Sequence, residues 1–121
     1  MAKTIMIVED SASMRQLISF AIKGAGHDLI VADNGKDALA KLGRAPIDLF
    51  ITDVHMPEMD GIELIKQLRA MADYRFTPIV MLTTESQEAK KQEGKAAGAS
   101  GWIVKPFKPE QIINVIKRFV K

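Results

Sequence analysis

Short apolar runs alternate along the chain with longer segments in which apolar residues recur every three or four positions. The runs TIMIV at 4–8 and DLIVA at 28–32 have the length and the β-branched content of strands. Similar runs predict strands at 48–52, 78–83 and 102–104. Because most of these runs are apolar throughout, without a polar residue at every second position, we expect a parallel sheet covered on both faces.

The segments between the runs have helical periodicity. In the first of them, apolar residues fall on one helix face: Met14, Leu17, Ile18, Ala21 and Ile22. Ser11 or Ser13 can cap this helix, and Gly24 and Gly26 end it. We predict four further helices: a short one that stops near Gly43, one with Asp60 as its N-cap, a polar one over 86–97, and one that begins at Pro109. In the polar helix, Gly94 is expected to cost ~1 kcal/mol relative to alanine.

The order of these elements is (βα)5, which predicts an α/β fold with a doubly wound, five-stranded parallel sheet. A chain of 121 residues suits one domain with one core. We expect right-handed crossovers. Tyr74 and Phe76, just before the fourth run, could cover the edge of the sheet or meet a partner, and we favour packing against the sheet. In such sheets ligands sit at the carboxyl ends of the strands, so the residues that follow each run are the ones to inspect.

Chemically capable side chains follow four of the five runs. Glu9 and Asp10 follow the first, Asp53 the third, Thr83 ends the fourth, and Lys105 follows the fifth. Clustered carboxylates repel one another, and this is tolerated where a cation is bound. Oxygen ligands without histidine or cysteine favour Mg²⁺, which usually keeps part of its shell for water and phosphate. The pattern therefore predicts a Mg²⁺ site with room for a phosphoryl group.

Asp53 lies at the end of the middle apolar run, in the stretch ITDVHMPEMDG at 51–61. Its carboxylate is the natural nucleophile of such a site. A carboxylate can attack phosphorus and form an aspartyl phosphate, provided that the oxygens of the transferred group are neutralised. Lys105 could pair with one of these oxygens, and the Thr83 hydroxyl could donate to another. Each residue alone also has a structural explanation: a helix N-terminal acid pair, an Asx-turn, a strand end and a surface lysine. Their common position at strand ends favours the functional interpretation.

Composition narrows the class of protein further. The chain has no cysteine, which excludes disulfides and thiolate metal sites. We expect a cytoplasmic monomer, because MAKTIMIVED is not a signal peptide and no apolar run approaches the roughly 18 residues of a membrane span. Residues 87–121 contain eight basic and three acidic side chains, whereas residues 1–86 contain nine basic and twelve acidic ones. The basic third suits an acidic protein partner better than nucleic acid, because no DNA-binding motif appears in the sequence.

These residues together resemble the receiver domains of two-component response regulators, over essentially the whole chain. The resemblance rests on Glu9-Asp10, on DVHMPEMDG from Asp53, on Thr83, and on KPF at 105–107. It is strongest to the stand-alone, chemotaxis-type regulators, and it implies a flavodoxin-like sheet with the strand order 2-1-3-4-5. It also implies a single receiver domain over residues 1–121 without an output domain.

The resemblance further implies a role for each site residue. Asp53 would accept a phosphoryl group from a histidine kinase, and Mg²⁺ would be held by Asp10, Asp53, the backbone carbonyl of His55 and, through water, Glu9. Thr83 and Lys105 would bind the phosphoryl group, Trp102 would rotate inward behind Thr83, and the Lys105–Pro106 bond would be cis. His55 and Glu85 flank the site at positions that tune the lifetime of the phosphate. The chain departs from many relatives in Glu9, where a second aspartate is common, and in Trp102, where Tyr or Phe is usual.

These expectations describe a switch that is not a turnover enzyme. Phosphorylation would change the face formed by the fourth helix, fifth strand and fifth helix. This face would then bind a target, for which the flagellar switch is a candidate. A single-domain phosphorelay carrier or a phosphate sink would share this pattern. A Mg²⁺-dependent phosphatase with an aspartyl nucleophile, a flavin-binding electron carrier of similar topology and a kinase-independent adaptor also remain open.

Overall fold

The computed structural model describes residues 3–44, 46–84 and 88–120. The described residues contain five strands: β1 (Thr4–Val8), β2 (Asp28–Ala32), β3 (Leu49–Asp53), β4 (Ile79–Thr84) and β5 (Gly101–Lys105). They form one sheet in which every neighbouring pair is parallel, in the order β2-β1-β3-β4-β5. The sheet is therefore the doubly wound, flavodoxin-like one that the sequence and its resemblance predicted.

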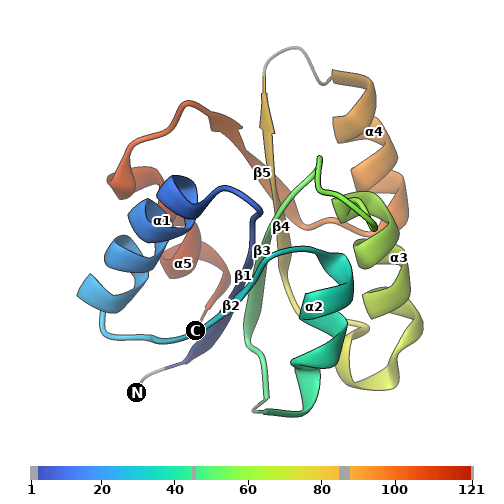
Figure 1. Ribbon diagram of the computed structural model, residues 1–121, viewed down its shortest axis with the longest axis horizontal. Coiled ribbons are helices and arrows are strands. Elements are labelled where there is room, and N and C mark those ends of the chain that lie inside the picture. Colours follow the sequence, from blue (N-terminus) through green and yellow to red (C-terminus); the bar gives the residue numbers. More distant parts are fainter. Residues whose placement is uncertain (1–2, 45, 85–87, 121) are drawn as a thin grey trace.

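Helices cover both faces of the sheet. Their bounds are α1 (Ala12–Gly24), α2 (Gly35–Ala40), α3 (Gly61–Ala70), α4 (Glu88–Ala97) and α5 (Pro109–Phe119). Helices α1 and α5 lie side by side on one face, and α2, α3 and α4 lie on the other (Figure 1). Two short 3-10 helices, Leu42–Arg44 and Ala72–Tyr74, were not predicted.

Each face of the sheet packs into its own hydrophobic cluster. One cluster joins alternate strand residues such as Met6 and Phe50 to α3, and the other joins Ile7 and Ile51 to α1 and α5. The strand residues of both clusters are almost fully buried, which explains why the strands read as continuous apolar runs. Burying one such aliphatic side chain contributes roughly 1.5–3 kcal/mol, so the two clusters together fix the positions of the strand ends.

The register of the strands brings the predicted site residues to one edge. Val8 pairs with Thr52, Asp53 with Leu82, and Thr84 with Lys105. The carboxyl ends of the strands lie together at the upper edge of the sheet in Figure 1. The residues at the carboxyl ends of β1, β3, β4 and β5 are consequently neighbours in space, although they are far apart in the sequence.

Local capping follows the sequence closely. The Ser11 side chain accepts a hydrogen bond from the Met14 amide at the start of α1, and Asp60 accepts one from the Glu63 amide at the start of α3. Gly26, just beyond α1, has a φ of 86°, in the left-handed region that favours glycine. The expected caps thus fix where α1 and α3 begin relative to the strand ends.

Two sequence-based interpretations need revision. Gly94 is not simply a weak point of α4: it is buried, and a Cβ atom there would collide with the Met81 side chain on β4. Its missing side chain allows α4 to approach the sheet closely. Tyr74 packs as expected, edge-on against Phe50 with ring centroids 5.2 Å apart, but Phe76 is 89% exposed, so its predicted packing was wrong. Within the described residues, no helix is both long and apolar enough to cross a bilayer.

Candidate functional site

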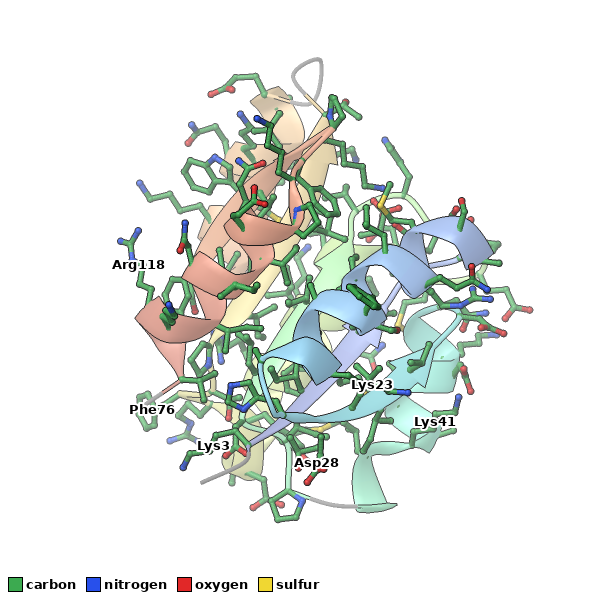
Figure 2. All side chains as sticks on the ribbon, turned by 90° about the vertical axis from the view of Figure 1, so that its left-hand side faces the viewer. Lys3, Lys23, Asp28, Lys41, Phe76 and Arg118 are labelled. Atoms are coloured by element: carbon green, nitrogen blue, oxygen red, sulfur yellow. The ribbon has the colours of Figure 1, made fainter. Side chains whose placement is uncertain are left out.

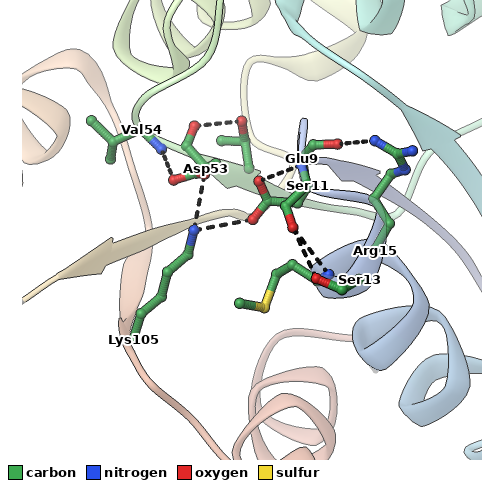
Figure 3. Close-up of polar contacts among 9 residues, drawn as sticks. Glu9, Ser11, Ser13, Arg15, Asp53, Val54 and Lys105 are labelled. Atoms are coloured by element: carbon green, nitrogen blue, oxygen red, sulfur yellow. Dashed lines mark hydrogen bonds and ion pairs between the residues drawn. The ribbon is translucent and has the colours of Figure 1, made fainter.

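Asp53 lies at the centre of the site, as the last residue of β3. It is only 7% exposed. One carboxylate oxygen, Oδ1, accepts a hydrogen bond from the Val54 amide at 2.8 Å, and the other, Oδ2, lies 2.9 Å from the Lys105 Nζ atom (Figure 3). Each oxygen of the Asp53 carboxylate therefore accepts one hydrogen bond.

Glu9 follows β1 and is 1% exposed, which makes it the most buried acid of the described residues. Its Oε1 atom lies 3.0 Å from Lys105 Nζ, and its Oε2 atom accepts a hydrogen bond from the Ser11 amide. Burial raises the pKa of Glu9 to about 7, with a further increase from Asp53 that Lys105 only partly offsets. When ionised, Glu9 and Asp53 carry two negative charges, whereas Lys105 supplies one positive charge.

Asp10 completes a group of three acids at this edge. Ligand oxygens of Glu9, Asp10 and Asp53 lie within 4.8 Å of one another, and the Asp10 side chain is exposed to solvent. A set of carboxylate oxygens that is partly buried and open on one side fits Mg²⁺, which binds one or two carboxylates and keeps several waters. Burial, with a smaller contribution from Asp53, raises the pKa of Glu9, and a cation bound here would favour the charged form of this carboxyl.

Lys105 connects the ends of three strands. Its side chain is 20% exposed and reaches from β5, at one edge of the sheet, to Glu9 after β1 and Asp53 on β3. Burial alone lowers the pKa of Lys105, but the hydrogen bonds and charges of Asp53 and Glu9 outweigh this effect, so that its pKa lies above the usual value. The Lys105–Pro106 peptide bond is cis, in agreement with the resemblance.

Thr83 contributes a buried hydroxyl near the end of β4. The residue is fully buried at the end of β4, and its Oγ1 atom has no hydrogen-bond partner among the described residues. A buried hydroxyl without a partner costs about 1–3 kcal/mol, so such groups are rare in folded proteins. The Thr83 hydroxyl is thus a buried donor that the described residues leave without an acceptor.

A tight turn holds the Asp53 backbone. The Gly61 amide donates to the Val54 carbonyl at 2.8 Å, and a Cβ atom on Gly61 would collide with the carbonyl oxygen of Asp53. Glu58, within the same loop, has a φ of 70°, which is uncommon for a residue with a side chain. The MPEMDG segment therefore wraps closely around the strand end that carries Asp53.

The other predicted residues lie farther from this centre or cannot be placed. His55 follows in the loop with an exposed side chain. Trp102 is 44% exposed on β5, with its ring 5.8 Å from Lys91 Nζ on α4. Glu85 lies outside the described residues. The structure thus brings Glu9, Asp10, Asp53 and Lys105 together, with Thr83 at the neighbouring strand end.

Arg15 is a residue of the site region that sequence reasoning missed. Its Nη1 atom donates to the Glu9 carbonyl at 2.9 Å and lies 3.4 Å from a carboxylate oxygen of Asp33, which follows β2. The signal was present in the sequence, because Arg15 falls in the first turn of α1, where the helix dipole disfavours a cation. A cation in that place indicates a nearby acceptor, and the Glu9 carbonyl and Asp33 supply it.

Comparisons with known proteins agree with this geometry. The response regulator receiver domain family matches residues 5–117. A CheY chemotaxis homologue of Campylobacter jejuni is 39% identical over 108 residues, 88% of this chain and 83% of the relative. The structure of the chemotaxis response regulator CheY4 of Vibrio cholerae superposes with a TM-score of 0.93 at 46% identity, covering 99% of this chain and all of that one.

The relatives also include longer transcriptional regulators. ResD of Bacillus subtilis is 36% identical over 117 residues, 97% of this chain but 48% of the relative, and PhoP of the same species gives a similar match. The chain thus spans about half the length of these two relatives. An α/β fold with a cluster of acids at the carboxyl edge of its sheet defines the structural class.

The chain belongs to the response regulator receiver domain family. Members of this family are signalling proteins of two-component systems. They accept a phosphoryl group from histidine kinases, act on downstream targets, and generally bind Mg²⁺ at an acidic pocket.

Proposed function

We propose that this protein is a phosphorylation-activated switch whose phosphoryl acceptor is Asp53. The observation that carries the proposal is the position of the Asp53 carboxylate, 2.9 Å from Lys105 Nζ and beside the acids Glu9 and Asp10. The buried hydroxyl of Thr83, which has no partner in the described part of the chain, supports it, since a phosphoryl oxygen would satisfy that donor. Together these residues can supply what a transferred phosphoryl group needs: a nucleophile, a group of acids that can bind a metal ion, and donors to the phosphoryl oxygens.

In the proposed reaction, a carboxylate oxygen of Asp53 attacks the phosphorus of a phosphohistidine. The new O–P bond forms as the N–P bond breaks, and the electron pair of that bond returns to the imidazole nitrogen. Lys105 shifts from the free carboxylate to a phosphoryl oxygen, and Thr83 donates to another. Mg²⁺ would neutralise the remaining charge, bound by Asp10, Asp53, the His55 carbonyl and, through water, Glu9.

The readout surface in this proposal is the face formed by α4, β5 and α5. The aspartyl phosphate adds about 1.5–2 negative charges, which draw Thr83 and Lys105 from their present positions. Trp102, on β5 between α4 and α5, would then change its exposure. His55 and Glu85 would set the lifetime of the phosphate. The similarity to CheY-type relatives supports a role in chemotaxis, with a flagellar switch as the proposed target.

A test of this function is the intact mass after incubation with Mg²⁺ and acetyl phosphate. We expect one added phosphoryl group in the wild type and none in Asp53→Asn or without Mg²⁺. A stable adduct that persists in Asp53→Asn would contradict the assignment of the acceptor. If no adduct accumulates, a Mg²⁺-dependent beryllofluoride complex distinguishes rapid hydrolysis from an inactive site, because that complex does not hydrolyse; its absence would favour a kinase-independent adaptor.

A further inference from the structure

We propose that Arg15 is a positioning residue that orients Asp10 for metal binding by holding the backbone carbonyl of Glu9. The inference rests on the proposed Mg²⁺ site and extends it. Arg15 Nη1 donates to the Glu9 carbonyl oxygen at 2.9 Å, and Figure 3 shows the guanidinium reaching back from α1 to that oxygen. The Arg15 side chain is 24% exposed, so this contact is largely shielded from water.

The Glu9 carbonyl lies where the sheet no longer supplies a partner. The Glu9 amide still donates to the Ala32 carbonyl at 3.0 Å, but β1 ends at Val8 and α1 begins only at Ala12. A buried carbonyl without a donor is costly, and a charged donor forms a stronger hydrogen bond than a neutral one. Arg15 therefore fixes the orientation of the peptide group between Glu9 and Asp10.

That orientation decides where the Asp10 side chain starts. The peptide group is planar, so the Glu9 carbonyl and the Asp10 Cα atom move together. The Asp10 side chain is exposed, and no hydrogen bond or ion pair to its carboxylate occurs within residues 3–44, 46–84 and 88–120. The backbone is consequently the main restraint that keeps the Asp10 carboxylate within 4.8 Å of those of Glu9 and Asp53.

The charge of Arg15 would have the opposite effect on a metal. Arg15 is a cation beside an acidic pocket, so its electrostatic contribution alone disfavours Mg²⁺. Replacing it by alanine would strengthen Mg²⁺ binding if charge were its main contribution, and would weaken binding if orientation were. The two roles therefore predict opposite signs for a single measurement.

The experiment is a titration of the full chain with MgCl2 in which binding is monitored through amide chemical shifts. The ionic strength is kept near 0.15 M, where distant surface charges are screened. We expect Arg15→Ala to raise the Kd for Mg²⁺ about tenfold, the lower range observed when outer-shell partners of metal ligands are removed. Arg15→Lys keeps the charge and one flexible donor, so its Kd should lie between those of wild type and Arg15→Ala.

Two control variants separate the carbonyl contact from other effects. Asp33→Asn removes the ion pair of Arg15, 3.4 Å long, but leaves the contact with Glu9, and Lys23→Ala removes a charge near the far end of the same helix (Figure 2). Both should bind Mg²⁺ within about twofold of wild type. Urea unfolding without metal shows whether each variant is folded. If Arg15→Ala does not fold, Arg15→Lys carries the test, and its Kd must then exceed that of wild type at least twofold.

A Kd for Arg15→Ala equal to or below that of wild type overturns the inference, as does an equally large loss in Asp33→Asn or no recovery in Arg15→Lys. If wild type itself does not bind Mg²⁺, the proposed metal site fails instead. The two failures are therefore distinguishable in the same titration.

Discussion

At the scale of single residues, the lack of a side chain at Gly61 is as important for the site as the side chains that form it. Gly61→Ala would place a methyl group against the carbonyl oxygen of Asp53, which cannot move without shifting β3. We expect the free energy of unfolding to fall by about 1–3 kcal/mol, as for other overpacked positions, and the affinity for Mg²⁺ to fall with it. Urea denaturation and a Mg²⁺ titration measure the two effects.

Gly24→Ala is the matched control for this substitution. A Cβ atom on Gly24 meets nothing within 4 Å, and the residue lies in the last turn of α1. Alanine has the better helix propensity, so Gly24→Ala should leave stability unchanged or raise it by up to about 1 kcal/mol. Equal stability of the two variants would show that the turn around Asp53 is not tightly packed.

Glu9 should make the stability of the metal-free protein depend on pH. Its pKa is raised from 4.5 in the unfolded chain to about 7 in the fold, chiefly by burial. A raised carboxyl pKa stabilises the fold below about pH 4.5, and this contribution is lost as the pH rises through 7. Relative to Glu9→Gln, which cannot ionise, wild type should therefore lose on the order of 2 kcal/mol between pH 5 and pH 8.

Urea denaturation in EDTA at several pH values measures this difference. The exposed Glu110→Gln serves as the control, and its stability should follow that of wild type at every pH. Parallel pH profiles for wild type and Glu9→Gln would mean that Glu9 is ionised in the fold at little cost.

At the scale of elements, α4 and β5 are joined by a contact that the one tryptophan can report. Lys91 on α4 has a side chain that is 13% exposed, and its Nζ atom lies 5.8 Å from the Trp102 ring centroid. Lys91→Ala should uncover the ring, which is now 44% exposed. We expect red-shifted fluorescence and stronger quenching by acrylamide. Lys90→Ala, which removes a pair with Glu93 instead, should leave both unchanged; a shift as large as that of Lys91→Ala would contradict the contact.

The elements were more predictable from the sequence than the contacts between them. The apolar runs predict every strand to within one residue at each end, because burial on both faces requires continuous apolar side chains. The strand ends also predict the group around Asp53, since parallel strands bring their carboxyl ends to one edge. Arg69 was not predicted. It donates from the end of α3 to the nearby carbonyls of Tyr74 and Thr77 and to that of Gly98, 29 positions away, and no periodic pattern indicates that one side chain joins these segments.

Close packing between elements was the other feature that could not be predicted from the sequence. The sequence indicates only that Gly94 weakens a polar helix. In the structure, the Met81 side chain occupies the space that a side chain on Gly94 would need. Phe76 is a large apolar residue of a kind that usually packs in a core. Nothing in the spacing of the residues around it indicates that its side chain is exposed to solvent. Both depend on the distance between two elements, which periodicity does not determine.

At the scale of the whole molecule, Lys105 joins segments that the sequence keeps far apart. Its Nζ atom lies 3.0 Å from Glu9 and 2.9 Å from Asp53, across 96 and 52 positions of the chain. Lys105→Met would leave two buried carboxylates without their cation, and breaking a buried ion pair in this way costs up to about 3–5 kcal/mol. Since Lys105 remains 20% exposed, we expect a loss of about 1–3 kcal/mol in metal-free urea denaturation at pH 8.

The same variant should reveal that this ion pair and Mg²⁺ stabilise the fold by one mechanism, the neutralisation of Glu9 and Asp53. Adding Mg²⁺ should therefore restore more stability to Lys105→Met than it adds to wild type, and Lys105→Met should cost less in an Asp53→Asn background, with a coupling of at least about 1 kcal/mol. The exposed Lys66→Met should show neither effect. Additive losses in the double variant would mean that Lys105 acts on the fold independently of Asp53, and that the edge of the sheet is held together by its backbone alone.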